Sequence, residues 1–155
     1  MEQAMDVRLR DGTDREPFRP RAAHLVLLAA VCGALYFYGI GTLPLMDPDE
    51  SRCALVVKEM EQTGGWLMPH LMGKPYFDKP APFFWLAAGG QWLTGNVQAG
   101  GRVVAALAAL LAVIVTYLFV ARAFGRRAGL LAGLALATSV QFWFMARWYR
   151  MDMPF

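Results

Sequence analysis

Three long stretches of this chain contain no charged residue, and they separate its polar segments. The stretches are 22–46, 103–121 and 128–146. A helix of 19 residues is about 28 Å long, close to the roughly 30 Å hydrocarbon core of a bilayer. The pattern therefore predicts three transmembrane helices, and the first is long enough to tilt or to protrude.

The polar segment 47–102 contains a shorter apolar stretch from Ala81 to Leu93. Such a stretch reaches only about 20 Å as a helix, a length typical of interfacial or re-entrant segments. Apolar residues also recur at helical spacing earlier in the segment, at Cys53, Val56, Val57 and Met60. We therefore expect two helices on the membrane surface, at about 49–63 and 81–94.

Arginines set the expected orientation. The leader 1–21 and the turn 122–127 are both rich in arginine, and arginine-rich segments near spans stay in the cytoplasm. The segments 47–102 and 147–155 are then extracytoplasmic. The predicted fold class is an all-α, polytopic integral membrane protein, and we expect the chain to be the amino-terminal part of a longer protein.

Composition agrees with a membrane class. Hydrophobic residues make up 57% of the chain and charged residues 17%, whereas soluble domains have about 25% charged residues. The basic residues that produce the net charge of +3 flank spans or lie among acids, so no nucleic-acid partner is expected. The two cysteines fit neither a disulfide framework nor a metal-binding spacing.

The segment after the first predicted span begins with Asp47-Pro48-Asp49-Glu50, which has the pattern of a helix start. Asp47 is then the N-cap and Glu50 closes a capping box. Asp49 is not needed for the cap. Asp49 can interact favourably with the helix dipole, pair with Arg52 one turn later, or act in a functional site. Arg52 can either form that pair or bind a phosphate.

Lys79 precedes the second predicted surface helix, in the proline-rich stretch 73–80, with Asp78 as a candidate N-cap. A lysine beside free helix N–H groups at a bilayer surface suits a lipid phosphate. Simple anchoring of the lysine at the interface is the alternative. Asp152, which follows Arg147 and Arg150 beyond the third span, is expected either to form salt bridges or to join Asp49 in one extracytoplasmic site.

Three segments, DPDESR, MGKPYFDKPAPFFWL and RWYRMDMPF, together resemble the GT-C membrane glycosyltransferases. This superfamily includes the lipid A aminoarabinose transferases and the protein O-mannosyltransferases, and the resemblance covers about residues 22–155. It implies a GT-C-type helical bundle that transfers a sugar, with inversion, from a polyprenyl (undecaprenyl) phosphate on the extracytoplasmic side.

The resemblance also implies roles for particular residues. It makes Asp49 and Asp152 catalytic, and it makes Lys79 the contact of the carrier phosphate. It places three further residues around the substrate: Arg52, Tyr76 and Glu50.

Some positions depart from the family's pattern. Asp78 stands where Glu is more common and where a divalent metal has been suggested, so it is the candidate metal ligand. Cys53 stands where an aromatic residue is common, and Ala81 where a second proline is usual.

The expected reaction moves 4-amino-4-deoxy-L-arabinose to lipid A on the periplasmic side of the bacterial inner membrane. Mannosyl transfer to protein is the alternative. Two other classes are a transporter fragment, which the absence of charge in the spans disfavours, and a non-enzymatic scaffold that binds membrane lipids. Later helices would complete the site, so these residues alone are expected to be inactive.

Overall fold

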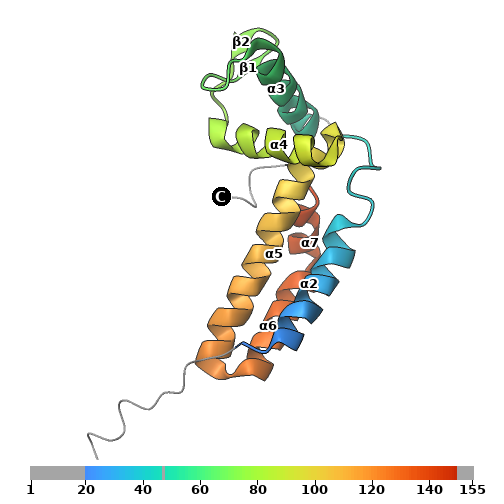
Figure 1. Ribbon diagram of the computed structural model, residues 1–155, viewed down its shortest axis with the longest axis vertical. Helices are drawn as coiled ribbons and strands as arrows, with labels where there is room; N and C mark the ends of the chain where they lie inside the picture. The colour runs from blue at the N-terminus through green and yellow to red at the C-terminus, as the bar shows by residue number, and fades with distance from the viewer. Residues whose placement is uncertain (1–19, 47, 150–155) are drawn as a thin grey trace, which may run out of the picture.

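The computed structural model describes residues 20–46 and 48–149 and shows a helical bundle with a smaller head at one end (Figure 1). The bundle contains α2 (Ala22–Phe37), α5 (Val97–Phe124), α6 (Arg126–Thr138) and α7 (Val140–Ala146). The head contains α3 (Asp49–Thr63), β1 (His70–Leu71), β2 (Lys74–Pro75) and α4 (Ala81–Thr94). The two short strands pair antiparallel, with His70 opposite Pro75.

Helix α5 is the axis of the molecule and carries the second predicted span. It begins earlier than the expected 103–121, because the Asn96 side chain caps it by accepting a hydrogen bond from the Ala99 N–H at 3.0 Å. Among the described residues, α5 is the one helix that is by itself long and apolar enough to cross a bilayer. Arg102 therefore lies inside α5 and not at the end of a loop.

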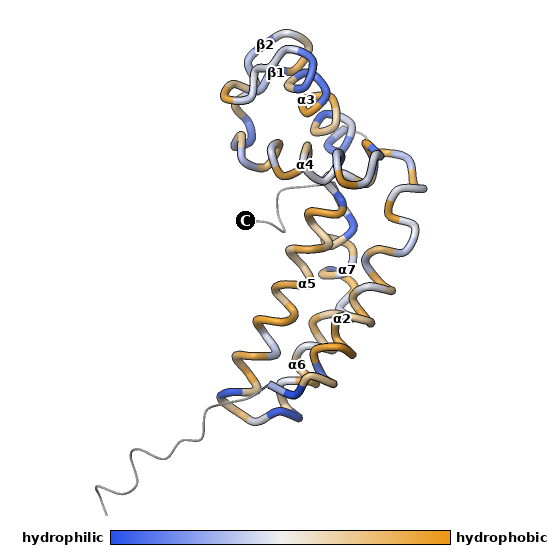
Figure 2. The backbone as a smooth tube through the Cα atoms, in the orientation of Figure 1, coloured by the Kyte–Doolittle hydropathy of each residue, from blue (hydrophilic) through white to orange (hydrophobic). Residues whose placement is uncertain are grey.

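One side of α5 presents apolar side chains to the outside of the bundle. The side chains are Leu107, Leu111, Val115 and Phe119, each at least half exposed. Their spacing of four residues places them on one helix face. Figure 2 shows hydrophobic residues along α5 and α6 and polar residues at the two ends of the bundle, a distribution that suits an apolar surrounding.

The helix predicted over 22–46 is shorter in the structure, where α2 ends at Phe37. Gly39 follows with a φ of +64°, and Pro44 could not continue a helix because its ring would clash with the carbonyl of Ile40. Residues 38–46 instead form an irregular segment that runs toward the head (Figure 1).

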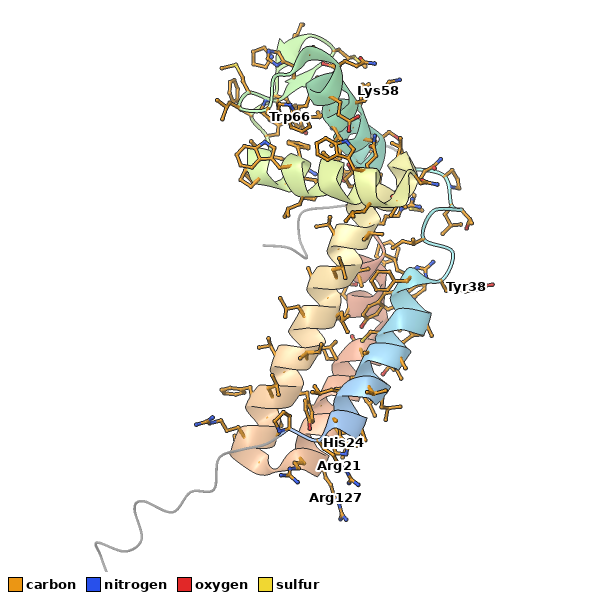
Figure 3. The ribbon with its side chains drawn as sticks, viewed as in Figure 1. Arg21, His24, Tyr38, Lys58, Trp66 and Arg127 are labelled. Carbon is orange, nitrogen blue, oxygen red and sulfur yellow. The ribbon has the colours of Figure 1, made fainter. Side chains whose placement is uncertain are left out.

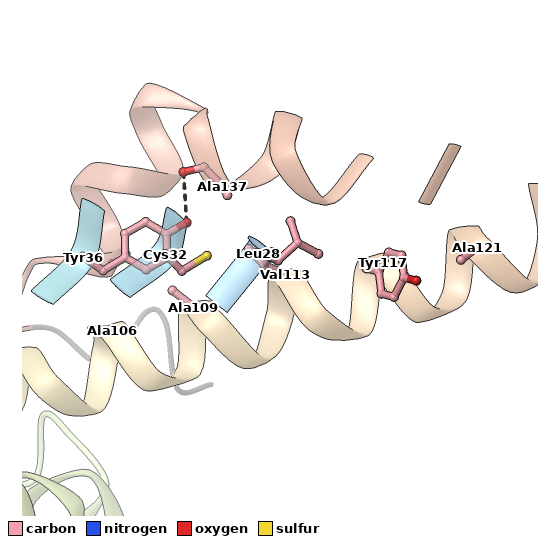
Figure 4. Packing of buried hydrophobic residues seen from close by; sticks show 10 residues of the cluster. Leu28, Cys32, Tyr36, Ala106, Ala109, Val113, Tyr117, Ala121 and Ala137 are labelled. Atoms are coloured by element: carbon pink, nitrogen blue, oxygen red, sulfur yellow. Dashed lines mark hydrogen bonds between the residues drawn. The ribbon is translucent and has the colours of Figure 1, made fainter. Parts of the chain in front are cut away.

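The helix predicted over 128–146 is broken at Ser139 into α6 and α7, which meet at 66°. The Thr138 hydroxyl bonds back to the Leu134 carbonyl at 2.9 Å, a local bond that competes with regular helix. The hydroxyl of Tyr36 donates to the Ala137 carbonyl at 3.0 Å (Figure 4). This bond supplies a donor to a carbonyl at the break.

Small residues bring the bundle helices close together. A Cβ on Gly129 would overlap the backbone of α5 near Tyr117 and Ala121, and a Cβ on Gly133 would press on Leu28 of α2. Tyr36, Ala109 and Val113 fill the buried core between these helices (Figure 4). Lys58 and Trp66 lie in the head, whereas Arg21 and Arg127 lie at the opposite end of the bundle (Figure 3).

The two head helices have the bounds expected from the sequence. Gly64, with a φ of +70°, ends α3 as the glycine there predicts. Helix α4 starts after Pro80 and has no side-chain cap, so Asp78 is not its N-cap. Gly90 of α4 crosses Gly100 of α5 so closely that a Cβ would overlap the Gly100 carbonyl, which fixes the head across the end of α5.

Candidate functional site

The most buried charges of the described residues are Glu50 of α3 and Arg102 of α5. They are 1% and 4% exposed. The Arg102 Nη2 atom lies 2.6 Å from Glu50 Oε2, and Arg102 Nε donates to Glu50 Oε1 at 3.0 Å. This two-point geometry is the strong form of an arginine–carboxylate contact.

Arg102 also holds the segment that follows α2. Its Nη1 atom donates to the Ile40 and Leu43 carbonyls at 3.2 and 2.8 Å, and its Nη2 atom donates to the Pro44 carbonyl at 2.8 Å. An irregular segment leaves such carbonyls without helical partners. One side chain thus satisfies three of them and ties this segment to the start of α5.

Glu50 gathers two further backbone donors. Its Oε2 atom accepts from the Met46 N–H at 2.8 Å, and its Oε1 atom accepts from the Tyr149 N–H at 2.7 Å. The resemblance assigns Glu50 to substrate binding. In the structure its carboxylate is buried, and it joins α3, α5 and the chain just beyond α7.

The ion pair predicts how stability depends on pH. Burial opposes the charge on Glu50, but hydrogen bonds from Arg102 and from the Met46 and Tyr149 N–H groups hold its pKa below the ordinary value of 4.5. A lowered pKa means that its stabilisation is present above the unfolded-state value and is lost as the pH falls through the folded-state value. We expect the gap in thermal midpoint between the wild type and Glu50→Gln to be wide at neutral pH and to narrow below pH 4.5.

Thermal unfolding of the complete protein from about pH 7 to pH 3 checks this expectation. Asp78→Asn, a change at an exposed carboxyl, should give a small gap at every pH. A gap for Glu50→Gln that stays constant below pH 4.5 would contradict the expectation.

Lys79 reaches from the connection before α4 to the first turns of α3. Its ammonium lies 3.6 Å from the buried Cys53 thiol and 6.0 Å from the centre of the Phe83 ring. A thiol is a weak acceptor, and an ammonium can donate three hydrogen bonds. Lys79 therefore keeps capacity for an anionic ligand.

Charged residues of α3 and of the connection before α4 shift the pKa values of Cys53 and Tyr76. Burial raises the pKa of the Cys53 thiol, Lys79 opposes that rise, and Asp49 adds to it. Burial also raises the pKa of Tyr76, as do Asp78 and Asp49, while Arg52 opposes the rise. Lys79 and Asp49 thus both act on Cys53. Asp49, Arg52 and Asp78 act on Tyr76.

Local structure explains this convergence. Asp49 and Arg52 lie in the first turn of α3, where acidic side chains are stabilised by the helix dipole. Tyr76 is fixed by its N–H, which donates to the Pro69 carbonyl at 2.8 Å, and by an edge contact with the Phe84 ring. The proline-rich connection then carries Asp78 and Lys79 back to α3.

Two expected features are not placed by the structure. Asp152 lies outside the described residues. Within the described residues, no group of three or more His, Cys, Asp or Glu side chains is arranged to hold a metal ion. Asp78 is exposed and belongs to no such group.

A pocket of about 250 Å³ lies beside the ion pair, between the segment after α2 and α7. The polar atoms of Glu50 and Arg102 at its wall are occupied by each other and by backbone groups. The pocket therefore suits an apolar chain. Its lining is Ile40, Leu43, Pro44, Met46, Glu50, Arg102, Trp143, Phe144, Arg147 and Trp148.

Sequence reasoning missed Arg102 and Tyr149. The sequence pattern places Arg102 only at the end of the polar segment 47–102. Gly100 and Gly101 directly before it were the available signal, because a Cβ on Gly101 would overlap the Tyr149 ring. Paired glycines in a helix indicate a close approach of another segment.

The model of one protein family, described as dolichyl-phosphate-mannose-protein mannosyltransferase, matches residues 78–155, half of the chain. The chain belongs to this family. The match confirms the GT-C resemblance drawn from the sequence, and the family's description names the transfer of a sugar from a lipid phosphate.

Curated relatives of this mannosyltransferase family member are named undecaprenyl phosphate-α-4-amino-4-deoxy-L-arabinose arabinosyl transferases. One from Pseudomonas fluorescens is 42% identical over 98 residues, which cover 63% of this chain and 18% of the relative. One from Edwardsiella ictaluri is 37% identical over 114 residues, which cover 71% of this chain and 20% of the relative. The chain thus spans about a fifth of the length of these relatives.

Solved structures show the same fold. ArnT from Cupriavidus metallidurans bound to undecaprenyl phosphate is 32% identical, with a TM-score of 0.76 over 83% of this chain and 24% of that one. The apo form of the same protein gives a TM-score of 0.74 at 33% identity. The helical fold is therefore shared with the solved structures of ArnT.

Proposed function

We propose that this chain contributes the donor-phosphate end of the active site of a membrane glycosyltransferase. The reaction moves 4-amino-4-deoxy-L-arabinose, with inversion, from undecaprenyl phosphate to lipid A on the periplasmic side of a bacterial inner membrane. The observation that carries the proposal is the contact of Lys79 with Cys53 at the start of α3, with Asp49 acting on both Cys53 and Tyr76 and Arg52 acting on Tyr76. The names of the relatives support the choice of sugar and carrier.

Lys79, helped by Arg52, stabilises the phosphate that departs when the sugar leaves its carrier. Preorganised cations act most strongly where charge develops in the transition state. Tyr76 forms part of the wall of this site. The apolar pocket beside the ion pair is large enough for part of the isoprenoid chain of the carrier.

Asp49 pairs with the sugar amine or acts as a base. A charge-assisted hydrogen bond is worth about 1.5–3 kcal/mol and would be denied to a neutral hexose. Asp152 is proposed to join it, because the bond from the Tyr149 N–H to Glu50 brings the described end of the chain beside Asp49. Glu50 positions these segments through its buried carboxylate.

The proposed topology places the head outside and the arginine-rich end of the bundle in the cytoplasm. α2, α5 and the bent pair of α6 and α7 then cross the membrane. Arg21 and Arg127 at the far end of the bundle from the head favour this orientation (Figure 3).

A transfer assay with the complete protein tests the proposal. The wild type is expected to add mass to lipid A from undecaprenyl phosphate-linked aminoarabinose. Asp49→Asn should lose at least about 10-fold in kcat/KM if it pairs with the amine, and about 10²–10⁴-fold in kcat if it is a base.

Lys58→Gln removes a charge from the exposed side of the same helix and should leave transfer unchanged. The family description makes mannosyl transfer to protein the second candidate. Mass gain on protein alone, from a mannose donor, would establish that candidate. Normal turnover in Asp49→Asn would remove Asp49 from the site.

A further inference from the structure

A second pocket, which has polar side chains in its lining, lies on the head between the C-terminal parts of α3 and α4. Its volume is about 410 Å³, within the range of roughly 300–1,000 Å³ that is usual for ligand sites. The pocket is lined by Glu61, Trp66, Gln91, Trp92, Gly95 and Val97. None of these residues is among Asp49, Arg52, Cys53, Tyr76, Asp78 and Lys79, the residues of the proposed donor-phosphate site.

Two aromatic rings form one side of this pocket. Trp66 and Trp92 meet edge to face, with their ring centres 5.7 Å apart. Trp66 is held by its carbonyl, which accepts from the Trp85 indole N–H at 2.7 Å. Trp92 is 67% exposed, and its indole N–H donates to Glu61, so it offers an oriented aromatic face to a ligand.

The carboxylate of Glu61 is held in place by neutral donors. Its Oε1 atom accepts from the Trp92 indole N–H at 2.8 Å, and its Oε2 atom accepts from Gln91 Nε2 at 3.2 Å. A carboxylate has about four lone-pair positions, so acceptor capacity remains on both oxygens. A ligand that donates hydrogen bonds would meet an oriented acceptor here.

The Gln91 side chain gives independent support. Its Oε1 atom is buried and has no hydrogen-bond partner within residues 20–46 and 48–149. Buried polar atoms without a partner are rare in folded proteins and call for an explanation such as an absent ligand or water. The atom belongs to a residue that lines the pocket, beside the Glu61 acceptor.

We infer that this pocket binds a saccharide ring of the acceptor, with hydroxyl groups that donate to Glu61 and one sugar face on Trp92. The inference rests on the proposed function for the source of the saccharide. Glu61 lies about 12 Å along α3 from Cys53 at 1.5 Å per residue. A sugar bonded directly to a phosphate at Lys79 would not reach the pocket, so the ring belongs to the second substrate.

The test measures saccharide binding to the complete protein by saturation-transfer NMR, without any turnover. The probe is a β-1,6-linked disaccharide of N-acetylglucosamine that carries no acyl chain and no phosphate. A methyl glycoside of 4-amino-4-deoxy-L-arabinose is the second arm and reports the donor sugar. We expect the disaccharide to bind the wild type and Asp49→Asn equally.

Glu61→Gln and Trp92→Ala should each weaken disaccharide binding about 10-fold or more, the effect expected for a lost contact to a charged group. Glu61→Gln keeps the side-chain shape, so it remains informative if Trp92→Ala fails to fold. Leu93→Ala, at a neighbouring position that is 85% exposed and does not line the pocket, is the matched control.

Three results with the disaccharide would overturn the inference. They are no binding of the disaccharide to the wild type, binding that Glu61→Gln and Trp92→Ala leave unchanged, and binding that only Asp49→Asn removes. Preferential binding of the aminoarabinose glycoside in this pocket would also overturn it, since the ring would then come from the donor. Failure of the transfer assay refutes the proposed reaction, whereas binding at Glu61 is measured separately.

Discussion

Arg102→Ala is expected to destabilise the complete protein by about 3–5 kcal/mol, because it leaves a buried carboxylate without its partner. Glu50 is 1% exposed and accepts two of its hydrogen bonds from Arg102. The same substitution removes the donors to the Ile40, Leu43 and Pro44 carbonyls. The segment after α2 and the head should therefore loosen together.

Thermal unfolding in detergent, followed by circular dichroism, measures this effect. Arg122→Ala removes an exposed arginine from the last turn of α5 and should change the midpoint little. Replacing both members of the pair, as Glu50→Leu with Arg102→Met, should recover part of the loss, since no unpaired charge remains buried. An unchanged midpoint for Arg102→Ala would show that the pair does not hold the head.

Lys79→Ala is expected to reduce sugar transfer by about 10²–10³-fold, the usual cost of removing one preorganised group that stabilises transition-state charge. The contacts that Lys79 makes with Cys53 and Phe83 are weak, so folding should be little affected. The loss should appear in kcat more than in the thermal midpoint. Single-turnover assays with undecaprenyl phosphate-linked aminoarabinose measure it.

Lys74→Ala, at an exposed lysine in β2 of the same connection, is the control and should keep full activity. Lys79→Arg should retain part of the activity, because the charge is kept while its position changes. A Lys79→Ala variant that turns over normally would limit Lys79 to anchoring the head at the interface.

The head helices could be predicted because their signals are local. The apolar spacing from Cys53 to Met60 and the glycine at position 64 define α3 without reference to the rest of the chain. Lys79 could be singled out as a candidate for the same reason, since its neighbours are prolines and a helix start. These patterns depend on residues within a few turns.

The ends of the bundle helices were harder to predict, because absence of charge does not distinguish a helix from an apolar irregular segment. Gly39 and Pro44 were visible inside 22–46, but the partner that satisfies the resulting carbonyls is Arg102, about sixty residues away. The break at Ser139 likewise involves Tyr36 of another helix. Long-range partners of this kind leave little trace in a local pattern.

The position of Glu50 has a consequence for biosynthesis. Its carboxylate joins Arg102 and Tyr149, which lie 52 and 99 residues further along the chain. A ribosome that has synthesised α3 and α4 has produced the acid but neither of these donors, and contacts of such sequence separation form late. The contacts that fix the head to the bundle therefore form only after α7 has been translated. In truncated nascent chains that end within α6, the head should be more sensitive to proteases.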